Sequence, residues 1–247
     1  MNTINSRLKD FKLAGILANL NERLTYAKES DLSYTDFLEL LLEDEENNRR
    51  DNSYKKKYLL AKFPSHKTIE EFDFSFQPSI DKKIFNDSLT CHYIRESNNI
   101  VFIGNPGTGK THLATILGIQ AIRKGYKVLF TSVNEMLQNL HISKADNSYY
   151  KKLNFYLEPK LLILDELGFK KIPNYSSDDF FEVIAKRYEH GSLIITTNKP
   201  FEQWVDIFGD HILSQAILDR VVHHSIIFKI NGQSYRTKNL KKQEEKH

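Results

Sequence analysis

The residues with the clearest chemical potential form the glycine-rich stretch Gly104–Thr111, which reads Gly-Asn-Pro-Gly-Thr-Gly-Lys-Thr. Glycines at this spacing let backbone N–H groups approach an anion closely. Lys110 adds a positive charge, and the Thr111 hydroxyl can ligate a divalent cation. The pattern is typical of a loop that binds the phosphates of a nucleotide. We expect the nucleotide-binding set to be Gly104, Asn105, Pro106, Gly107, Thr108, Gly109, Lys110, Thr111 and His112.

Two adjacent carboxylates, Asp165 and Glu166, directly follow the apolar run Leu161–Leu164. Taken alone, an apolar run that ends in acidic residues is a common transition from strand to loop. Together with the phosphate-binding loop, the pair predicts Mg²⁺-dependent hydrolysis of ATP. Asp165 and Thr111 would hold the metal, Glu166 would polarise the attacking water, and Lys110 would face the terminal phosphates.

A third polar position follows another apolar run. Asn198 comes directly after Leu193–Thr197, and its amide could hydrogen-bond the γ-phosphate or the attacking water. The alternative is that Asn198 only caps a turn before Pro200. We favour the catalytic role because parallel strands present their carboxyl ends at one edge of a sheet.

These residues need a scaffold of alternating strands and helices. The apolar patterns predict strands at 100–103, 127–131, 161–164 and 193–197, and helices at 110–123, 134–141 and 178–188. Strands separated by helix-length segments indicate an α/β fold with a parallel sheet covered on both faces. Further along, we expect a helix from Phe201 through Val222 and then a hairpin with strands at 225–230 and 234–237 around Asn231-Gly232.

The first part of the chain, 1–67, has a different, helical pattern. We expect a small all-helical domain, with a break near Gly15 and a helix that starts after Ser33 as N-cap. From Arg49 to Lys67 the chain is basic and carries interleaved aromatic residues, which suits contact with DNA phosphates. A solvated helix face is the alternative. The candidate DNA contacts are Arg49, Arg50, Lys55, Lys56 and Lys57.

Length and composition fit a globular protein of one or two domains. The chain has 247 residues, a formal net charge of +3 and one cysteine, so it cannot form an internal disulfide. No apolar stretch reaches the length of about 18 residues needed to span a bilayer. We expect a cytoplasmic protein with no membrane partner, divided into a helical domain at 1–67, a nucleotide-binding core at 68–240 and a charged tail at 241–247.

These motifs together resemble the core of AAA+ P-loop NTPases, and within that class the chain is similar to the IstB family. That family assists transposases of bacterial insertion sequences. Beyond the loop, the acidic pair and Asn198, the segments that carry the resemblance are 68–74, 164–169, 184–189, 196–204, 218–224 and 232–236. The resemblance covers nearly the whole chain.

The resemblance implies an ATPase that binds duplex DNA, forms ATP-dependent homo-oligomers and recruits a transposase. It makes Arg220 the expected arginine finger, which would act on the ATP of a neighbouring protomer. Arg236 is a weaker candidate for nucleotide contact, and Phe72, Asp73 and Phe74 are candidates for the border of the adenine. DnaC-type helicase loaders share the core, so a loader of a replicative helicase is the alternative function. A DNA-bound scaffold that hardly turns ATP over is a third.

Overall fold

The computed structural model describes residues 2–172 and 174–235. The chain divides into two compact units, residues 1–57 and 58–247. The division lies earlier than the boundary expected at residue 67. Phe63 shows why, because its ring packs edge-on against Phe130 in the sheet of the second unit, with centroids 6.2 Å apart.

The small unit consists of α1 (Asn2–Asp10), α2 (Ala14–Glu29) and α3 (Tyr34–Ala61), whose last turn belongs to the second unit. The expected break near Gly15 is confirmed, a few residues earlier in the chain. The helices separate at residues 11–13, where Lys12 takes a left-handed conformation with φ 59°. Gly15 instead lies inside α2, where a Cβ would come 2.5 Å from the Asp44 carbonyl oxygen of α3. The glycine therefore serves close helix packing.

Side chains of α3 hold α2 in place. Glu45 is buried and accepts hydrogen bonds from the backbone N–H groups of Gly15 (2.7 Å) and Ile16 (3.4 Å) in the first turn of α2. Arg23 donates to both carboxylate oxygens of Asp44, at 2.8 and 2.7 Å. The expected cap at the start of α3 is confirmed, since the Ser33 hydroxyl accepts from the Asp36 N–H at 3.2 Å.

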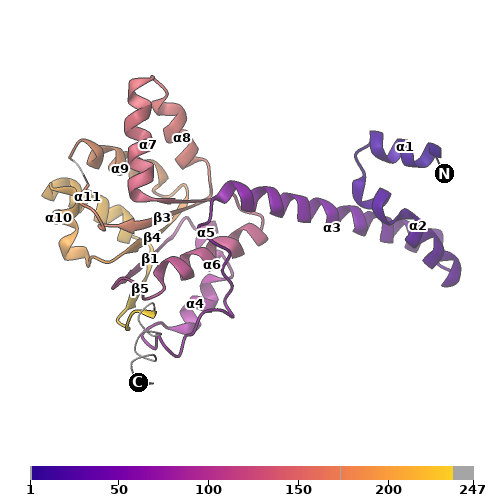
Figure 1. Cartoon of the computed structure of the whole chain (residues 1–247), viewed down its shortest axis with the longest axis horizontal. Helices are drawn as coiled ribbons and strands as arrows, with labels where there is room; N and C mark the ends of the chain where they lie inside the picture. The colour runs from indigo at the N-terminus through magenta and orange to yellow at the C-terminus, as the bar shows by residue number, and fades with distance from the viewer. Residues whose placement is uncertain (1, 173, 236–247) are drawn as a thin grey trace, which may run out of the picture. The chain divides into compact units, whose positions relative to one another are not determined.

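The second unit is built on a five-stranded sheet in the order β2-β3-β4-β1-β5 (Figure 1). All the neighbouring strands are parallel. Its strands are β1 (Asn99–Gly104), β2 (Val128–Ser132), β3 (Leu161–Leu167), β4 (Ser192–Thr197) and β5 (Ser225–Ile230). The order puts β4 between β1, which leads into the phosphate loop, and β3, which carries the two carboxylates.

The expected C-terminal hairpin is wrong. β5 pairs in parallel with β1, with Asn99 opposite Ser225 and Gly104 opposite Ile230. Residues 231–235 form no strand, and the Tyr235 N–H donates to the carbonyl oxygen of Gly107 in the phosphate loop at 2.9 Å. Thr237, the expected end of the hairpin, lies outside the described residues.

The second unit contains the predicted helices and further helices that were not predicted. They are α4 (Lys82–Ser88), α5 (His92–Arg95), α6 (Lys110–Arg123), α7 (Val133–Ala145), α8 (Tyr149–Leu157), α9 (Asn174–Arg187), the 3₁₀ turn η1 (Phe201–Gln203), α10 (Trp204–Phe208) and α11 (His211–Val222). The expected single helix before Val222 is interrupted at Gly209, which has φ 76°. A new helix starts there, because the Asp210 side chain accepts from the Leu213 N–H at 2.8 Å.

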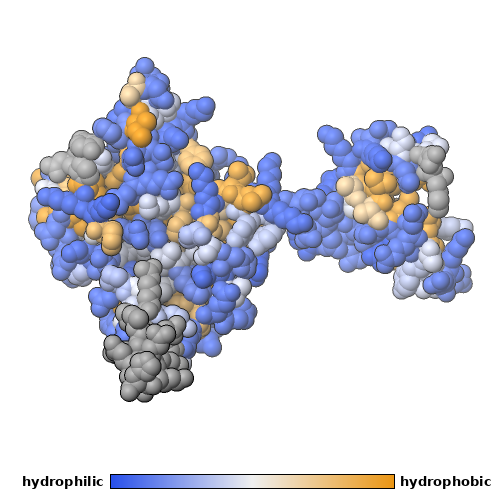
Figure 2. Space-filling view, viewed as in Figure 1, coloured by the Kyte–Doolittle hydropathy of each residue, from blue (hydrophilic) through white to orange (hydrophobic). Residues whose placement is uncertain are grey.

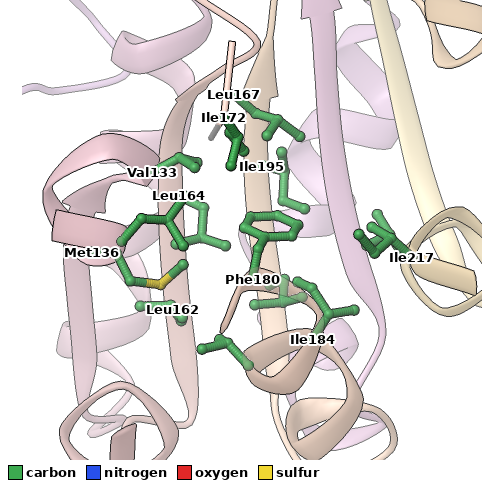
Figure 3. Close-up of a cluster of buried hydrophobic side chains, with 14 of the residues drawn as sticks. Val133, Met136, Leu162, Leu164, Leu167, Ile172, Phe180, Ile184, Ile195 and Ile217 are labelled. Atoms are coloured by element: carbon green, nitrogen blue, oxygen red, sulfur yellow. The ribbon is translucent and has the colours of Figure 1, made fainter. Parts of the chain in front are cut away.

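Alternation along the strands sends apolar side chains to both faces of the sheet. On one face, Leu162, Leu164 and Ile195 pack with Met136 of α7 and Phe180 of α9 in a fully buried cluster (Figure 3). On the other face lies α6, where Gly118 brings the helix so close that a Cβ would meet the Ile163 side chain at 2.7 Å. Helices therefore cover both faces, as expected for a parallel sheet.

A buried arginine ties the loop after α8 to the start of β4. Arg187 is 2% exposed, and its guanidinium donates to the carbonyl oxygens of Tyr156, Leu157, Lys160 and Ser192 at 2.9–3.3 Å. Burial lowers its pKa to about 10. The carbonyls at the C-terminal end of α8 otherwise have no intrahelical donors, so Arg187 satisfies them, and no carboxylate of the described residues pairs with it.

Hydrophilic residues cover most of the visible surface, and hydrophobic residues gather in places on both units (Figure 2). Among the helices that the structure describes, none has the long apolar stretch that a bilayer crossing requires.

Candidate nucleotide-binding site

The phosphate loop joins β1 to α6 at the carboxyl edge of the sheet. Gly107 and Gly109 have φ values of 79° and 96°, a conformation that glycine adopts without strain. The Lys110 ammonium donates to the carbonyl oxygens of Gly104 (2.7 Å) and Asn105 (2.8 Å), which holds it against the loop. The loop leads directly into the N-terminal end of α6, whose unpaired N–H groups favour an anion.

Asp165 and Thr111, which come from separate motifs and were predicted together as metal ligands, are in direct contact. The Thr111 hydroxyl lies 2.9 and 3.1 Å from the two carboxylate oxygens of Asp165. Asp165 is 7% exposed, at the end of the buried part of β3. A hydroxyl beside a carboxylate is a set of hard oxygen donors, which Mg²⁺ prefers.

Thr196 of β4 connects the two acidic residues, a role that no sequence motif predicted. Its hydroxyl donates to Asp165 Oδ1 and accepts from the Glu166 backbone N–H at 3.0 Å. The sequence signal for Thr196 is weak, because the hydroxyl of a threonine in a buried strand usually hydrogen-bonds a nearby backbone group. Only the pairing of β3 with β4 shows that Thr196 faces the carboxylates.

Glu166 sits at an irregularity in the sheet. The pairing of β3 with β4 shifts register between Leu164 and Leu167, and Glu166 has a φ of 63°. Its neighbours Asp165 and Leu167 are buried, whereas the Glu166 side chain is exposed. Non-glycine residues in this conformation are strained and are enriched at functional sites. The bulge turns the Glu166 carboxylate out from the sheet edge while Asp165 stays inside.

Asn198 directly follows β4, at the same edge as the loop and the carboxylates. Its Oδ1 atom is buried and accepts no hydrogen bond within the described part of the chain. Buried acceptors are rarely left unpaired in proteins. This position fits a group that accepts a hydrogen bond from a bound water or ligand.

A cavity of about 370 Å³ lies beside the loop. Its lining combines residues Gly107–His112 with part of the stretch 64–77 and with Tyr235. Of the three residues expected to border the adenine, Phe72 and Asp73 line this cavity. Phe74 packs inward against Phe85, with ring centroids 5.6 Å apart.

His112 lines the cavity on the flank of α6. Its ring packs edge-on against Phe72 at 5.4 Å, and its Nε2 lies 3.4 Å from the Thr68 carbonyl oxygen. Burial lowers the pKa of His112 below its ordinary value of 6.5, against the opposing effect of that carbonyl contact. The imidazole is therefore neutral at pH 7, so it would contribute contact area and no positive charge.

Arg220 lies away from this cavity, on α11. Its guanidinium stacks over the Phe181 ring at 5.0 Å and donates to the Ala216 carbonyl oxygen at 2.9 Å. Together with Tyr188, Phe201 and His223 it lines a separate surface hollow. Arg236, the other candidate arginine, lies outside the described residues.

The candidate DNA contacts on α3 differ in how much of their charge is already paired. Arg49 forms an ion pair with the buried Glu45 at 2.7 Å. Arg50 lies 3.9 Å from Glu46 and donates to Asn47 at 2.8 Å. Lys55 and Lys56 are exposed, and Lys57 is half-buried. Lys55 and Lys56 therefore offer the more exposed positive charge.

A strand, a glycine loop that carries Lys110, and a helix whose first turn holds Thr111 against Asp165 define a P-loop nucleotide-binding protein. Residues 6–243 match the family described as IstB-like ATP binding protein, and the chain belongs to that family. It is 42% identical to an ATP-binding protein of insertion sequence IS5376 from Geobacillus stearothermophilus, over 90% of this chain and 88% of the relative. The corresponding protein of insertion sequence IS21 from Pseudomonas aeruginosa is 36% identical, over 98% and 91%.

Solved structures confirm the AAA+ fold. The DnaC helicase loader superposes with a TM-score of 0.53 and 22% identity, over 60% of this chain and 86% of that protein. DnaA from Aquifex aeolicus, solved with AMPPCP bound, gives 0.57 and 21%, over 75% and 57%. These likenesses concern the fold. The chain is an ATP-binding AAA+ protein of the insertion-sequence type.

Proposed function

We propose that this protein is an Mg²⁺-dependent ATPase that assists the transposase of an insertion sequence. ATP would control its assembly into homo-oligomers on duplex DNA, and the assembly would recruit or regulate the transposase. The observation that carries the proposal is the contact between Thr111 and Asp165, with Glu166 turned outward beside them. A site that only held phosphate would not need an exposed carboxylate at a strained position.

The donor set at the sheet edge fits a magnesium ion. Thr111 and Asp165 would hold it, and Thr196 fixes the Asp165 carboxylate through its hydroxyl. When bound, Mg²⁺ neutralises charge on the β- and γ-phosphates. The buried Oδ1 of Asn198 supplies a further acceptor at this edge, without a hydrogen bond from the described residues.

The remaining work falls to the side chains of the chain itself. Lys110 would move from the loop carbonyls to the terminal phosphates. Glu166 would accept a proton from the attacking water, and Asn198 would orient that water. Because the bulge at Glu166 places its carboxylate outside the sheet, the base can reach solvent while Asp165 remains buried at the metal position.

Arg220 would complete the site of a neighbouring protomer. It lies apart from the residues that line the ATP cavity of its own chain, which supports a role in trans. The guanidinium is held over Phe181 and is half-buried, so its position is set before assembly. A preset arginine can neutralise charge on the transferring phosphoryl group.

The small unit would contact DNA and a protein partner. Lys55 and Lys56 present exposed positive charge for DNA phosphates. On the first half of α3, Tyr34, Leu38 and Leu42 are exposed by 96%, 56% and 56% at four-residue spacing, so they share one face of the helix. An exposed apolar stripe of this kind is typical of a surface that binds another protein.

A helicase loader remains the second candidate function. The fold supports it, because DnaC and DnaI are among the structural neighbours. The sequence relatives favour transposition, since the matches at 42% and 36% identity are proteins of insertion sequences, whereas DnaC is only 22% identical. A transposase gene beside this one would support transposition, and replication genes would support the loader.

The proposed activity can be tested by measuring ATP hydrolysis and particle size, with and without duplex DNA, for the wild-type protein and for Lys110→Ala. We expect the wild type to hydrolyse ATP and to assemble when ATP is present. Lys110→Ala should bind nucleotide weakly and stay small, because it lacks the charge that faces the terminal phosphates. If the wild type binds ATP and DNA without measurable turnover, the protein is an ATP-bound scaffold and the ATPase proposal fails.

A further inference from the structure

A short segment after β5 lies against the phosphate loop, and we call residues 231–235 the strap. The strap is attached to the stretch that enters the ATPase unit. The Asn231 N–H donates to Ser79 Oγ at 3.1 Å, and the Gln77 side-chain amide donates to the Gln233 carbonyl oxygen at 2.9 Å. Gly232 packs so closely on Gln77 that a Cβ would lie 1.7 Å from its Oε1. The strap therefore has a defined path.

The other side of the strap contacts the phosphate loop. The Tyr235 N–H donates to the Gly107 carbonyl oxygen at 2.9 Å. A Cβ on Gly107 would lie 2.1 Å from Ser234 Oγ, so the glycine is needed for this approach as well as for its left-handed backbone. The strap thus joins the phosphate loop to the stretch around Gln77, the two sides of the cavity.

The Tyr235 side chain lines this cavity and is 50% exposed. Its ring meets the Phe76 ring edge-on, with centroids 5.4 Å apart and planes at 84°. The ring of Phe72, another aromatic residue of the lining, lies close to Gly109. A Cβ on that glycine would be only 2.6 Å from the ring. The phosphates belong at the loop and at the first turn of α6, so the aromatic part of the cavity is left for the base.

We propose that Tyr235 is a specificity-determining residue of the ATP site, whose ring packs on the purine base. The inference rests on the proposed ATP site and deepens it. A purine offers a larger ring face than a pyrimidine, so an aromatic contact favours ATP over CTP. The strap sets the distance between base and phosphates, because the same residue holds Gly107 through its backbone.

The test compares ligands that share the phosphates and differ in the base. We would measure the affinity of the full-length protein for ATP, CTP and inorganic tripolyphosphate by calorimetry, for the wild type, Tyr235→Ala and Tyr235→Phe. Tyr235→Ala should weaken ATP binding by about tenfold or more, as loss of a base–aromatic contact does. It should also reduce the preference for ATP over CTP. Tripolyphosphate binding should not change, and Tyr235→Phe should behave like the wild type.

A second variant reports the contact directly. In Tyr235→Trp, ATP should change the fluorescence of the new indole and tripolyphosphate should not, against the constant signal of the buried Trp204. An equal loss of ATP and tripolyphosphate binding in Tyr235→Ala would overturn the proposal, since the strap would then act only on the loop. Unchanged ATP affinity would overturn it as well. A wild-type protein that binds ATP without hydrolysing it would contradict the proposed ATPase and leave this comparison intact.

Discussion

At the scale of single residues, the site depends on a chain of contacts from Thr111 to Asp165, on to the Thr196 hydroxyl and then to the Glu166 backbone. Thr111, Asp165 and Glu166 could be predicted because each belongs to a motif whose chemistry fixes the residue type. Thr196 and Tyr235 could not, because their roles depend on which strand pairs with β3 and on where the chain goes after β5.

Replacing Glu166 with glutamine should separate ATP binding from hydrolysis. The amide keeps the size of the side chain and cannot accept the proton, whereas Lys110, Thr111 and Asp165 stay intact. Turnover should fall by about 10²–10⁴-fold, the usual contribution of general-base catalysis, and ATP affinity should not weaken. Rapid-quench hydrolysis and equilibrium binding would measure the two quantities. Full turnover in this variant would remove Glu166 from the role of base.

At the scale of elements, the sequence predicted those whose apolar pattern was strong. The predicted bounds agree closely with those of β1, β3, β4 and α6. Buried strands and the loop between β1 and α6 leave little freedom in the sequence pattern. The hairpin was wrong because the chain does not turn back after Asn231-Gly232, a good turn signal, but runs to the phosphate loop, where the Tyr235 N–H donates to the Gly107 carbonyl oxygen. The break expected near Gly15 is confirmed at residues 11–13, whereas Gly15 itself lies inside α2 and serves packing against α3.

The attachment of α2 to α3 should depend on pH. Burial alone would raise the pKa of Glu45, but the Arg49 side chain and the N–H groups of Gly15 and Ile16 hold it below its ordinary value of 4.5. A carboxylate with a lowered pKa stabilises the fold above that value and loses the effect as the pH falls through the folded-state pKa. Glu45→Gln should therefore be less stable than the wild type at pH 7, by about 1–3 kcal/mol.

The difference between the two proteins should shrink as the pH falls below 4.5, because a protonated Glu45 resembles glutamine. Urea unfolding of the full chain, followed by circular dichroism from pH 7 to pH 3, would measure it. Asp44 titrates in both proteins and cancels in the comparison. A difference that does not vary with pH would show that the Glu45 charge is not what holds α2.

The basic end of α3 should contact DNA through phosphates. Replacing Lys55, Lys56 and Lys57 with glutamate should weaken DNA binding on every sequence and lower the salt slope by about 0.9 for each lost contact on a log–log plot. The matched control carries the same charge change at Lys9, Lys12 and Lys28, which are exposed and outside the basic run. If the two triple variants weaken DNA binding equally, the α3 lysines act through the net charge of the protein and not through direct phosphate contacts.

At the scale of the whole molecule, the proposed activity needs more than one copy of the chain. Arg220→Ala should bind ATP almost normally and hydrolyse it poorly, because the finger acts on a neighbouring site. Mixing it with Glu166→Gln should restore part of the activity, wherever an intact Arg220 meets an intact Glu166. A plot of the steady-state ATP hydrolysis rate against the mixing ratio of the two variants would then pass through a maximum. A clear loss of ATP affinity in the isolated Arg220→Ala protomer would place the arginine in its own site.

The left-handed backbone at Glu166 makes thermal stability and ATP hydrolysis conflicting demands on one residue. A residue with a β-carbon destabilises the fold by about 1–2 kcal/mol in this conformation, whereas glycine does not. Glu166→Gly should therefore melt about 2–8 °C higher than the wild type while losing hydrolysis. In a laboratory evolution experiment selected only for heat resistance, position 166 is where we expect glycine to appear early. Selection for transposition would restore glutamate.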